Sequence, residues 1–383
     1  MKKKNKAIYL LFLMPFVYFA TACFVVWLVK TSGIYPSGSD TMYHVYRGDY
    51  VYNAIKSGNW YPLYDPAWYN GVEILRYWSP FPAYVMAFCQ YLAGGSQFGA
   101  YLFYIGGVCF LGACVWPFIG RGFNRPYLGA FIGLLWFFMP NNLCAIFIEG
   151  NLARSLSMIF LPVFIYSVYK YLYNHKLRYI PLMVFTFLLM ELCHLGYAGM
   201  VAIAVIIYGI VYIIQKGRKK AVLDVVISMI FGFMLLGIWL VASLRGGITS
   251  LDNSENMANF FQNLWITINP FERLTRGFEY FYFGFATLVV IVFGILFGYK
   301  KSRTGFVTGF IILLMTTKSA YAVLKHLPGS QYLWMLRFIS IALCMILMSF
   351  LMWDRLKKTL VLMLCVLLVV DTIPSLSLIV GEH

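Results

Sequence analysis

The sequence predicts an all-α protein, a polytopic bundle of about eleven transmembrane helices. Of the 383 residues, 61% are hydrophobic and 11% are charged, whereas soluble domains carry about 25% charged residues. The apolar residues recur in runs of about 18 to 24, the length at which a helix crosses a hydrocarbon layer of ~30 Å. Because backbone polar groups in lipid must be satisfied within the segment, these runs are expected to be helices.

The predicted spans follow one another along the chain, which we interpret as a single membrane domain, residues 1–383. The first span continues as far as Val29, well past the 7–15 apolar residues usual in a signal peptide, and is therefore expected to remain as an anchor. The expected spans are 7–29, 97–120, 127–146, 152–170, 179–193, 197–215, 221–243, 280–299, 304–321, 332–353 and 358–378.

Basic residues lie at every second connection between these spans, so that all their clusters fall on one side of the bilayer. By the positive-inside rule this side is the cytoplasm, which places the N-terminus inside and the C-terminus outside. The net charge of +16 is thus a topology signal, and no nucleic-acid partner is expected. The clusters are the N-terminus, Arg121/Arg125, Lys170/Lys176/Arg178, Lys216/Arg218/Lys219/Lys220, Lys300/Lys301/Arg303 and Arg355/Lys357/Lys358.

Two larger outer segments result, at 31–96 and 245–279. Residues 80–93 are apolar but too short to span easily. A crossing there would also break the alternation of basic clusters. We therefore expect 80–93 to be a juxtamembrane helix within the first outer segment.

The first outer segment begins with a candidate catalytic pair, Asp40 and His44. Ser37 or Ser39 is expected to cap a helix with Asp40 in its first turn. The spacing of four residues then places Asp40 and His44 on one helical face. A carboxylate beyond a spanning helix can serve as general base on a hydroxyl, and His44 can orient it, contact phosphate or help to hold a metal. The alternative is an ordinary capping Asp beside an interfacial His.

Aromatic residues are dense in the same segment, among Pro and Gly residues that break regular structure. Trp60, Tyr64, Tyr77 and Trp78 are candidates for stacking on a sugar. Such rings also form the ordinary aromatic belt of the membrane interface.

Further ionisable residues lie near the outer ends of spans. Glu149 and Arg154 flank a short outer connection, where charges are costly and often functional. Gln331 precedes Arg337, which is expected ~9 Å inside its span. The Arg337 guanidinium there suits a phosphate, or else an internal salt bridge to Glu149 or Glu191.

These residues resemble a known family. The pattern Gly38-Ser39-Asp40…His44, Gly58…Trp60…Pro62, Gly71 and Ser79-Pro80 is similar to the first outer loop of GT-C-type membrane glycosyltransferases. The set that adds Glu149-Gly150-Asn151 and Gln331…Trp334…Arg337-Phe338 resembles bacterial membrane proteins labelled 6-pyruvoyl-tetrahydropterin-synthase-related.

The resemblance implies an inverting transfer, in a bacterial cytoplasmic membrane, from a polyprenyl-phosphate sugar donor to a glycan, lipid or protein hydroxyl. Asp40 would be the base, Glu149 the second acidic residue and Arg337 the phosphate ligand. Some members of the superfamily use a divalent cation such as Mg²⁺ or Mn²⁺, for which Asp40, His44 and Glu149 could form a partial site; whether this chain needs a cofactor stays open.

Two other functions compete with the transferase. A lipid-linked sugar flippase or transporter would favour charges in the middle of spans and broken helices in repeated halves. The informative residues here instead gather at outer ends. The third hypothesis is a non-catalytic cell-envelope assembly protein. The joint presence of Asp40, Glu149 and Arg337 disfavours it.

Overall fold

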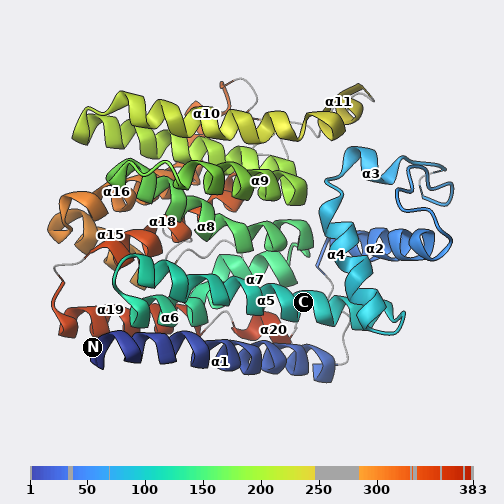
Figure 1. Cartoon of the computed structure of the whole chain (residues 1–383), viewed down its shortest axis with the longest axis horizontal. Helices are drawn as coiled ribbons and strands as arrows, with labels where there is room; N and C mark the ends of the chain where they lie inside the picture. Colours follow the sequence, from blue (N-terminus) through green and yellow to red (C-terminus); the bar gives the residue numbers. More distant parts are fainter. Residues whose placement is uncertain are drawn as a thin grey trace.

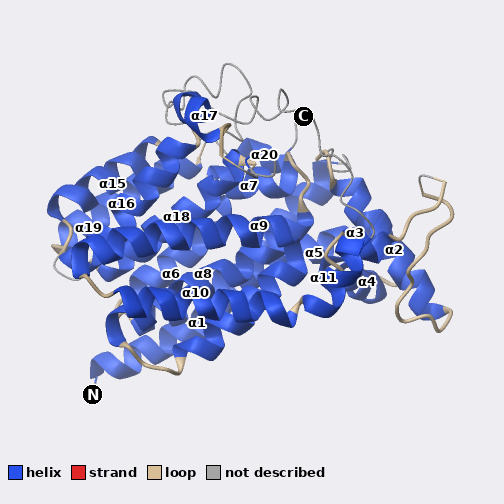
Figure 2. Ribbon diagram, turned by 90° about the horizontal axis from the view of Figure 1, so that it is seen from above, coloured by secondary structure: helices blue, strands red, loops and turns tan. Residues whose placement is uncertain are grey.

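The chain folds into a bundle of helices that lie side by side along the long axis of the molecule (Figures 1 and 2). The computed structural model describes residues 2–32, 38–68, 70–245, 284–327, 330, 334–353, 356–373 and 376–380. Within these ranges there is no strand, only an isolated bridge between Asp65 and Val72. The all-α prediction is thereby confirmed.

The helices follow the predicted spans closely. They are α1 (Lys2–Ser32), α2 (Thr41–Lys56), α3 (Ile74–Tyr77), α4 (Phe81–Leu92), α5 (Gln97–Gly122), α6 (Pro126–Leu135), η1 (Trp136–Phe138), α7 (Pro140–Phe147), α8 (Leu152–Asn174), α9 (Tyr179–Lys216), α10 (Lys219–Leu235), α11 (Gly237–Arg245), α15 (Phe285–Phe297), α16 (Lys300–Met315), α17 (Lys318–Leu324), η4 (Met335–Arg337), α18 (Phe338–Met352), α19 (Lys358–Thr372) and α20 (Ser377–Val380).

Five of the described helices are long and apolar enough to cross a membrane, or up to seven if two bent pairs each count as one span. One bent pair, α6/η1 with α7, turns by 44°, and the other, α10 with α11, turns by 65°. A chain that crosses the membrane several times is therefore supported, while the total of about eleven spans stays a prediction.

The 38-residue helix α9 reverses direction at His194, whose φ of −155° and ψ of 94° are not helical. A straight helix of that length would separate its ends by ~55 Å. Instead, the Tyr212 hydroxyl donates a hydrogen bond of 2.6 Å to the Leu172 carbonyl, just before α9 begins, and Arg218 contacts His175. The two halves therefore run antiparallel, as expected for separate spans at 179–193 and 197–215.

The basic clusters gather at one end of the bundle. Lys170 donates to the Gly122 carbonyl, and the Tyr173 hydroxyl donates to the Lys301 carbonyl at 3.0 Å. The N-terminus lies at this same end (Figure 1). The segments near Gly122, Lys170 and Lys301 thus lie together at the end that holds the N-terminus, as the predicted alternation requires of these clusters.

The first outer segment forms a cap at the opposite end, where α2, α3 and α4 lie beyond the long helices (Figure 1). The predicted juxtamembrane helix at 80–93 is α4, 12 residues long. It is fixed to α2 by a 2.6 Å hydrogen bond from the Gln90 amide to the Asp49 carboxylate. The second predicted outer segment, 245–279, lies outside the described residues after Arg245.

Candidate functional site

Backbone pairing between two distant segments builds the site. The amides of Ser39 and Asp40 donate to the carbonyls of Ile148 and Glu149 at 3.1 and 2.9 Å. The Ser39 hydroxyl also donates to the Glu149 carbonyl at 2.9 Å. The entrance to α2 is thereby held against the connection from α7 to α8, so that Asp40 and Glu149 become neighbours.

Gly150 makes this close approach sterically feasible, and replacing it by alanine is expected to disrupt the site. Its φ is +62°, and an added Cβ would lie 2.2 Å from Thr41 Oγ1 and 2.6 Å from the Thr41 amide nitrogen. We expect Gly150→Ala to lower the free energy of unfolding by about 2–4 kcal/mol, measured by thermal unfolding in detergent. Gly199→Ala is the control, because a Cβ there meets nothing within 4 Å. Equal stability of the two variants would contradict the proposed close packing.

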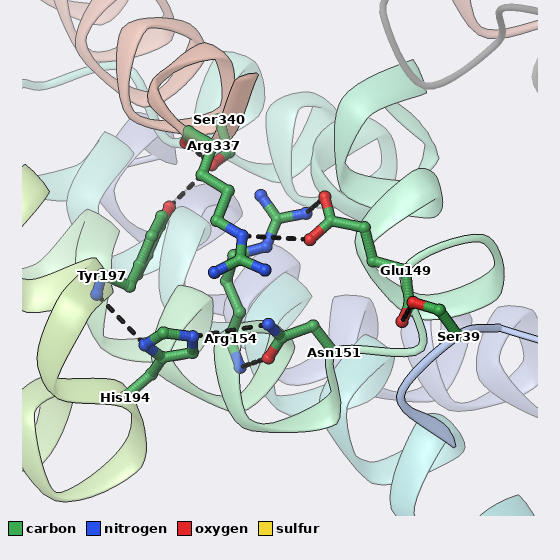
Figure 3. A network of polar contacts seen from close by, with 8 residues as sticks. All are labelled: Ser39, Glu149, Asn151, Arg154, His194, Tyr197, Arg337 and Ser340. Atoms are coloured by element: carbon green, nitrogen blue, oxygen red, sulfur yellow. Dashed lines mark hydrogen bonds and ion pairs between the residues drawn. The ribbon is translucent and has the colours of Figure 1, made fainter. Parts of the chain in front are cut away.

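Glu149 lies between two arginines that come from different helices (Figure 3). Its Oε1 is 2.5 Å from Nη2 of Arg154 in α8, and its Oε2 is 3.2 Å from Nε of Arg337 in η4. Both arginines are buried. One carboxylate thus faces two guanidinium groups, and this part of the site carries an excess of positive charge.

The structure corrects the expected depth of Arg337. The residue closes the 3₁₀ turn η4, directly before α18, and so lies at the end of its span rather than ~9 Å inside it. Its ion pair with Glu149 is one of the two salt bridges expected as alternatives to a phosphate ligand. Gln331, predicted beside it, lies outside the described residues.

Asp40 occupies the N-cap position of α2 rather than the first turn, because the helix begins at Thr41. The predicted capping by Ser39 is also wrong, since the N-cap position is occupied by Asp40 and Ser39 lies one residue before it; Ser37 lies outside the described residues. The Asp40 side chain makes no capping hydrogen bond with the helix. The carboxylate is therefore not used to hold the start of α2.

Opposing charges act on Asp40. Burial and the neighbouring Glu149 carboxylate raise the Asp40 pKa above its ordinary value, while Arg337 and Arg47 act to lower it. For His44, burial and then Arg47 hold the pKa well below its ordinary value. The site thus presents a carboxyl with increased proton affinity next to a neutral imidazole.

Arg47 is a third arginine of the site, and it was not predicted as a site residue from the sequence. Its Nη2 lies 3.5 Å from His44 Nδ1, and its Nε donates to the Tyr43 carbonyl at 3.1 Å. The spacing of Asp40, His44 and Arg47 in the sequence places all three on one face of a helix. This spacing is the signal that could have indicated Arg47.

The partial metal site considered for Asp40, His44 and Glu149 is not formed. The described residues contain no group of three or more His, Cys, Asp or Glu side chains placed to hold a metal ion. Both Glu149 oxygens face arginines, and His44 adjoins the Arg47 guanidinium. Asp40, His44 and Glu149 therefore do not fit a divalent cation, which prefers several free oxygen ligands.

Comparison with known proteins identifies the family. A family model described as the 6-pyruvoyl-tetrahydropterin synthase related domain, a membrane protein, matches residues 75–379. The chain belongs to this family. The matched range includes Glu149, Arg154 and Arg337 and begins after Asp40. No curated protein and no solved structure matches the chain.

Among the aromatic residues of this family member, Trp78 lies beside the charged site. Its ring stacks on Trp68 with a centroid distance of 5.6 Å and an interplanar angle of 2°, and the Arg47 guanidinium lies 4.9 Å from its centroid. Tyr43 stacks on the Trp68 ring at 5.8 Å. Trp68 is thus a site residue that sequence reasoning missed.

The other predicted aromatic residues are placed differently. Tyr77 packs edge-on against Trp78 at 6.4 Å. Trp60 and Tyr64 contact the tyrosines of α4 and α2, through hydrogen bonds from Tyr84 to the Trp60 carbonyl and from Tyr50 to the Tyr64 carbonyl. The side chains of Trp60 and Tyr64 are exposed. Trp60 and Tyr64 therefore belong to the periphery of the outer segment.

Ser79 links the outer segment to the reversal of α9. A continuous helix would pair the Leu195 amide with the Glu191 carbonyl. The Ser79 hydroxyl instead donates to that carbonyl at 3.0 Å and accepts from that amide at 3.3 Å. The side chain is thus inserted in the helical ladder, a known cause of sharp breaks.

We expect Ser79→Ala to destabilise the protein by about 1–3 kcal/mol, because two backbone groups lose their partner at once. Thermal unfolding in detergent measures this effect. Ser57→Ala is the control, since Ser57 is exposed and bonds only within its own helix end. An unchanged midpoint for Ser79→Ala would show that Ser79 does not hold the break.

Proposed function

We propose that this protein is a membrane glycosyltransferase of GT-C type. It moves a sugar from a polyprenyl-phosphate-linked donor to an acceptor hydroxyl of a glycan, lipid or protein. The observation that carries the proposal is the convergence of Asp40 with Glu149 and the arginines at the end of the bundle opposite the basic connections. A base and an anion-binding group are the two parts that such a transfer requires.

The charge distribution supports a reaction on the outer face of a bacterial cytoplasmic membrane. Basic connections usually lie in the cytoplasm, and Lys170, Lys301 and Arg218 gather at the far end from Asp40. The N-terminus is then cytoplasmic and the C-terminus is outside. A lipid-linked donor would present its phosphate at the level of the site.

The resemblance to GT-C glycosyltransferases implies a single displacement, and we propose this route. Asp40 removes the proton of the acceptor hydroxyl, whose oxygen forms the new bond to the anomeric carbon of the sugar. The bond from that carbon to the phosphate oxygen breaks, and the electron pair leaves with the polyprenyl phosphate. Attack opposite to the leaving group inverts the anomeric configuration.

The arginines supply the stabilisation of the leaving group. Arg154 and Arg337 carry two positive charges against the one negative charge of Glu149, so buried guanidinium groups compensate the charge of the added phosphate. The raised pKa of Asp40 makes its carboxylate a stronger base than an exposed one.

The direct test is transfer of a radiolabelled sugar from polyprenyl phosphate by membranes that contain the protein, compared with membranes that lack it. The proposal expects labelled acceptor and released polyprenyl phosphate. If labelled lipid moves between leaflets without release of its sugar, the protein is a flippase. If neither occurs with any donor, the transferase proposal is wrong and an assembly role remains.

A further inference from the structure

The side chains of Asn151 and His194 face each other beside the charged site, at the N-terminus of α8 and at the reversal of α9 (Figure 3). Asn151 Nδ2 lies 3.4 Å from His194 Nε2. Asn151 is buried, and His194 is half-buried. The direction of this contact depends on which atoms carry hydrogen.

Backbone amides determine both orientations. The Arg154 amide donates to Asn151 Oδ1 at 2.9 Å, so the other amide atom, facing His194, is the NH₂ donor. The Tyr197 amide donates to His194 Nδ1 at 3.1 Å, so that nitrogen carries no hydrogen. The neutral imidazole therefore carries its hydrogen on Nε2.

Two donors consequently face each other, and neither can accept from its neighbour. Arg154 adds further donors that lack an acceptor. Its side chain is fully buried, and its Nε and Nη1 have no hydrogen-bond partner in the part of the chain that the structure describes. Buried donors of this kind are costly unless an acceptor is present. The N-terminus of the 23-residue helix α8 adds a favourable potential for an anion.

We infer that Asn151, Arg154 and His194 form an oxyanion site that binds an unprotonated phosphate oxygen. Phosphate oxygens accept hydrogen bonds without donating one, which suits a set of donors. The positive charge of the two arginines beside Glu149 favours an anion over a neutral hydroxyl. His194 binds as a neutral donor, in a tautomer set by the backbone.

This inference rests on the proposed function for the source of the phosphate, which is the lipid-linked donor. The reversal of α9 at His194 then has a role in the site. The break, occupied by the Ser79 side chain, holds His194 in a non-helical conformation, and its imidazole lies against Asn151.

Asn151→Asp is the decisive variant, because it keeps the oxygen that accepts from the Arg154 amide and replaces the facing donor by a charged acceptor. We expect binding of a radiolabelled polyprenyl phosphate in detergent to weaken by at least about 10-fold. The thermal midpoint should stay the same or rise, since aspartate can accept from His194 Nε2. Asn124→Asp, an exposed position with the same change of charge, is the control.

A second pair of variants tests His194 by itself. His194→Phe removes the donor and should weaken binding, whereas His194→Gln restores an N–H donor and should recover most of it. Inorganic phosphate competes if the site recognises phosphate alone, and the unphosphorylated polyprenol should not bind. Unchanged affinity in both Asn151→Asp and His194→Phe would overturn the inference.

Binding does not require turnover, so the two proposals fail separately. Wild-type protein that binds polyprenyl phosphate through Asn151 and His194 but transfers no sugar would remove the transferase and retain the oxyanion site. Transfer that persists with normal donor affinity in both variants would retain the transferase and remove the site.

Discussion

Replacement of Asp40 by asparagine is expected to reduce sugar transfer by about 10²–10⁴-fold, the usual contribution of a general base. The change keeps the size and the N-cap position of the side chain but removes its proton affinity. Donor binding should change little, because the phosphate contacts lie on other residues. The measurement is the rate of transfer at saturating donor, beside the donor affinity of each protein.

The pH dependence of the wild type gives a second readout of the same residue. Because burial and Glu149 raise the Asp40 pKa, transfer should increase with pH through a pKa above the ~3.9 of a free aspartate. The low-pH limb of the profile belongs to Asp40 and should be absent from the residual activity of Asp40→Asn.

In Asp40→Asn, stability should stay the same or increase, whereas the rate of transfer should fall. A carboxyl whose folded pKa is raised contributes stability that is fully present below its unfolded pKa and is lost as pH rises through the folded pKa. At neutral pH the charged Asp40 is therefore unfavourable, and Asp40→Asn should be at least as stable as the wild type.

Asp49→Asn is the matched control for the Asp40 variant. Asp49 lies on the same helix and accepts from Gln90, a bond that the asparagine oxygen can also accept. Transfer should stay near the wild-type rate in this variant. Equal losses of activity in the two variants would mean that Asp40 has no special role as base.

The sequence predicted helices where they occur because hydrophobic runs and basic connections are local signals. The separation of 179–193 from 197–215 is an example, since the two apolar runs flank His194 and its reversal. The means by which the reversal is held could not be predicted. Ser79 lies 112 residues from Glu191 in the sequence, and no local preference indicates such a contact.

Part of the site could also be predicted from the sequence. Asp40, Glu149 and Arg337 were predicted as a group because ionisable residues at the outer ends of spans are costly and often functional, and the structure brings them together. The facing donors of Asn151 and His194 depend on backbone amides oriented by the fold. Their orientation is a tertiary property that residue types alone do not reveal.

Replacement of Glu149 by glutamine should produce the largest loss of stability in the site. The carboxylate is the ion-pair partner of both Arg154 and Arg337. Its neutralisation leaves two buried guanidinium groups without their ion-pair partner. Removing one partner of a buried ion pair costs about 3–5 kcal/mol, and we expect a loss of that size in thermal or denaturant unfolding in detergent.

Glu73→Gln provides the control for Glu149→Gln, because Glu73 pairs with Arg76 in a partly exposed position, where an ion pair contributes at most about 1 kcal/mol.

The thermal stability gained on adding polyprenyl phosphate should then distinguish a structural role of Glu149 from a role in an anion site. In the wild type the carboxylate competes with the phosphate for the same arginines, so Glu149→Gln should gain more thermal stability from the added lipid than the wild type gains. A variant that is destabilised but gains nothing from the lipid would mean that the arginines serve only the fold.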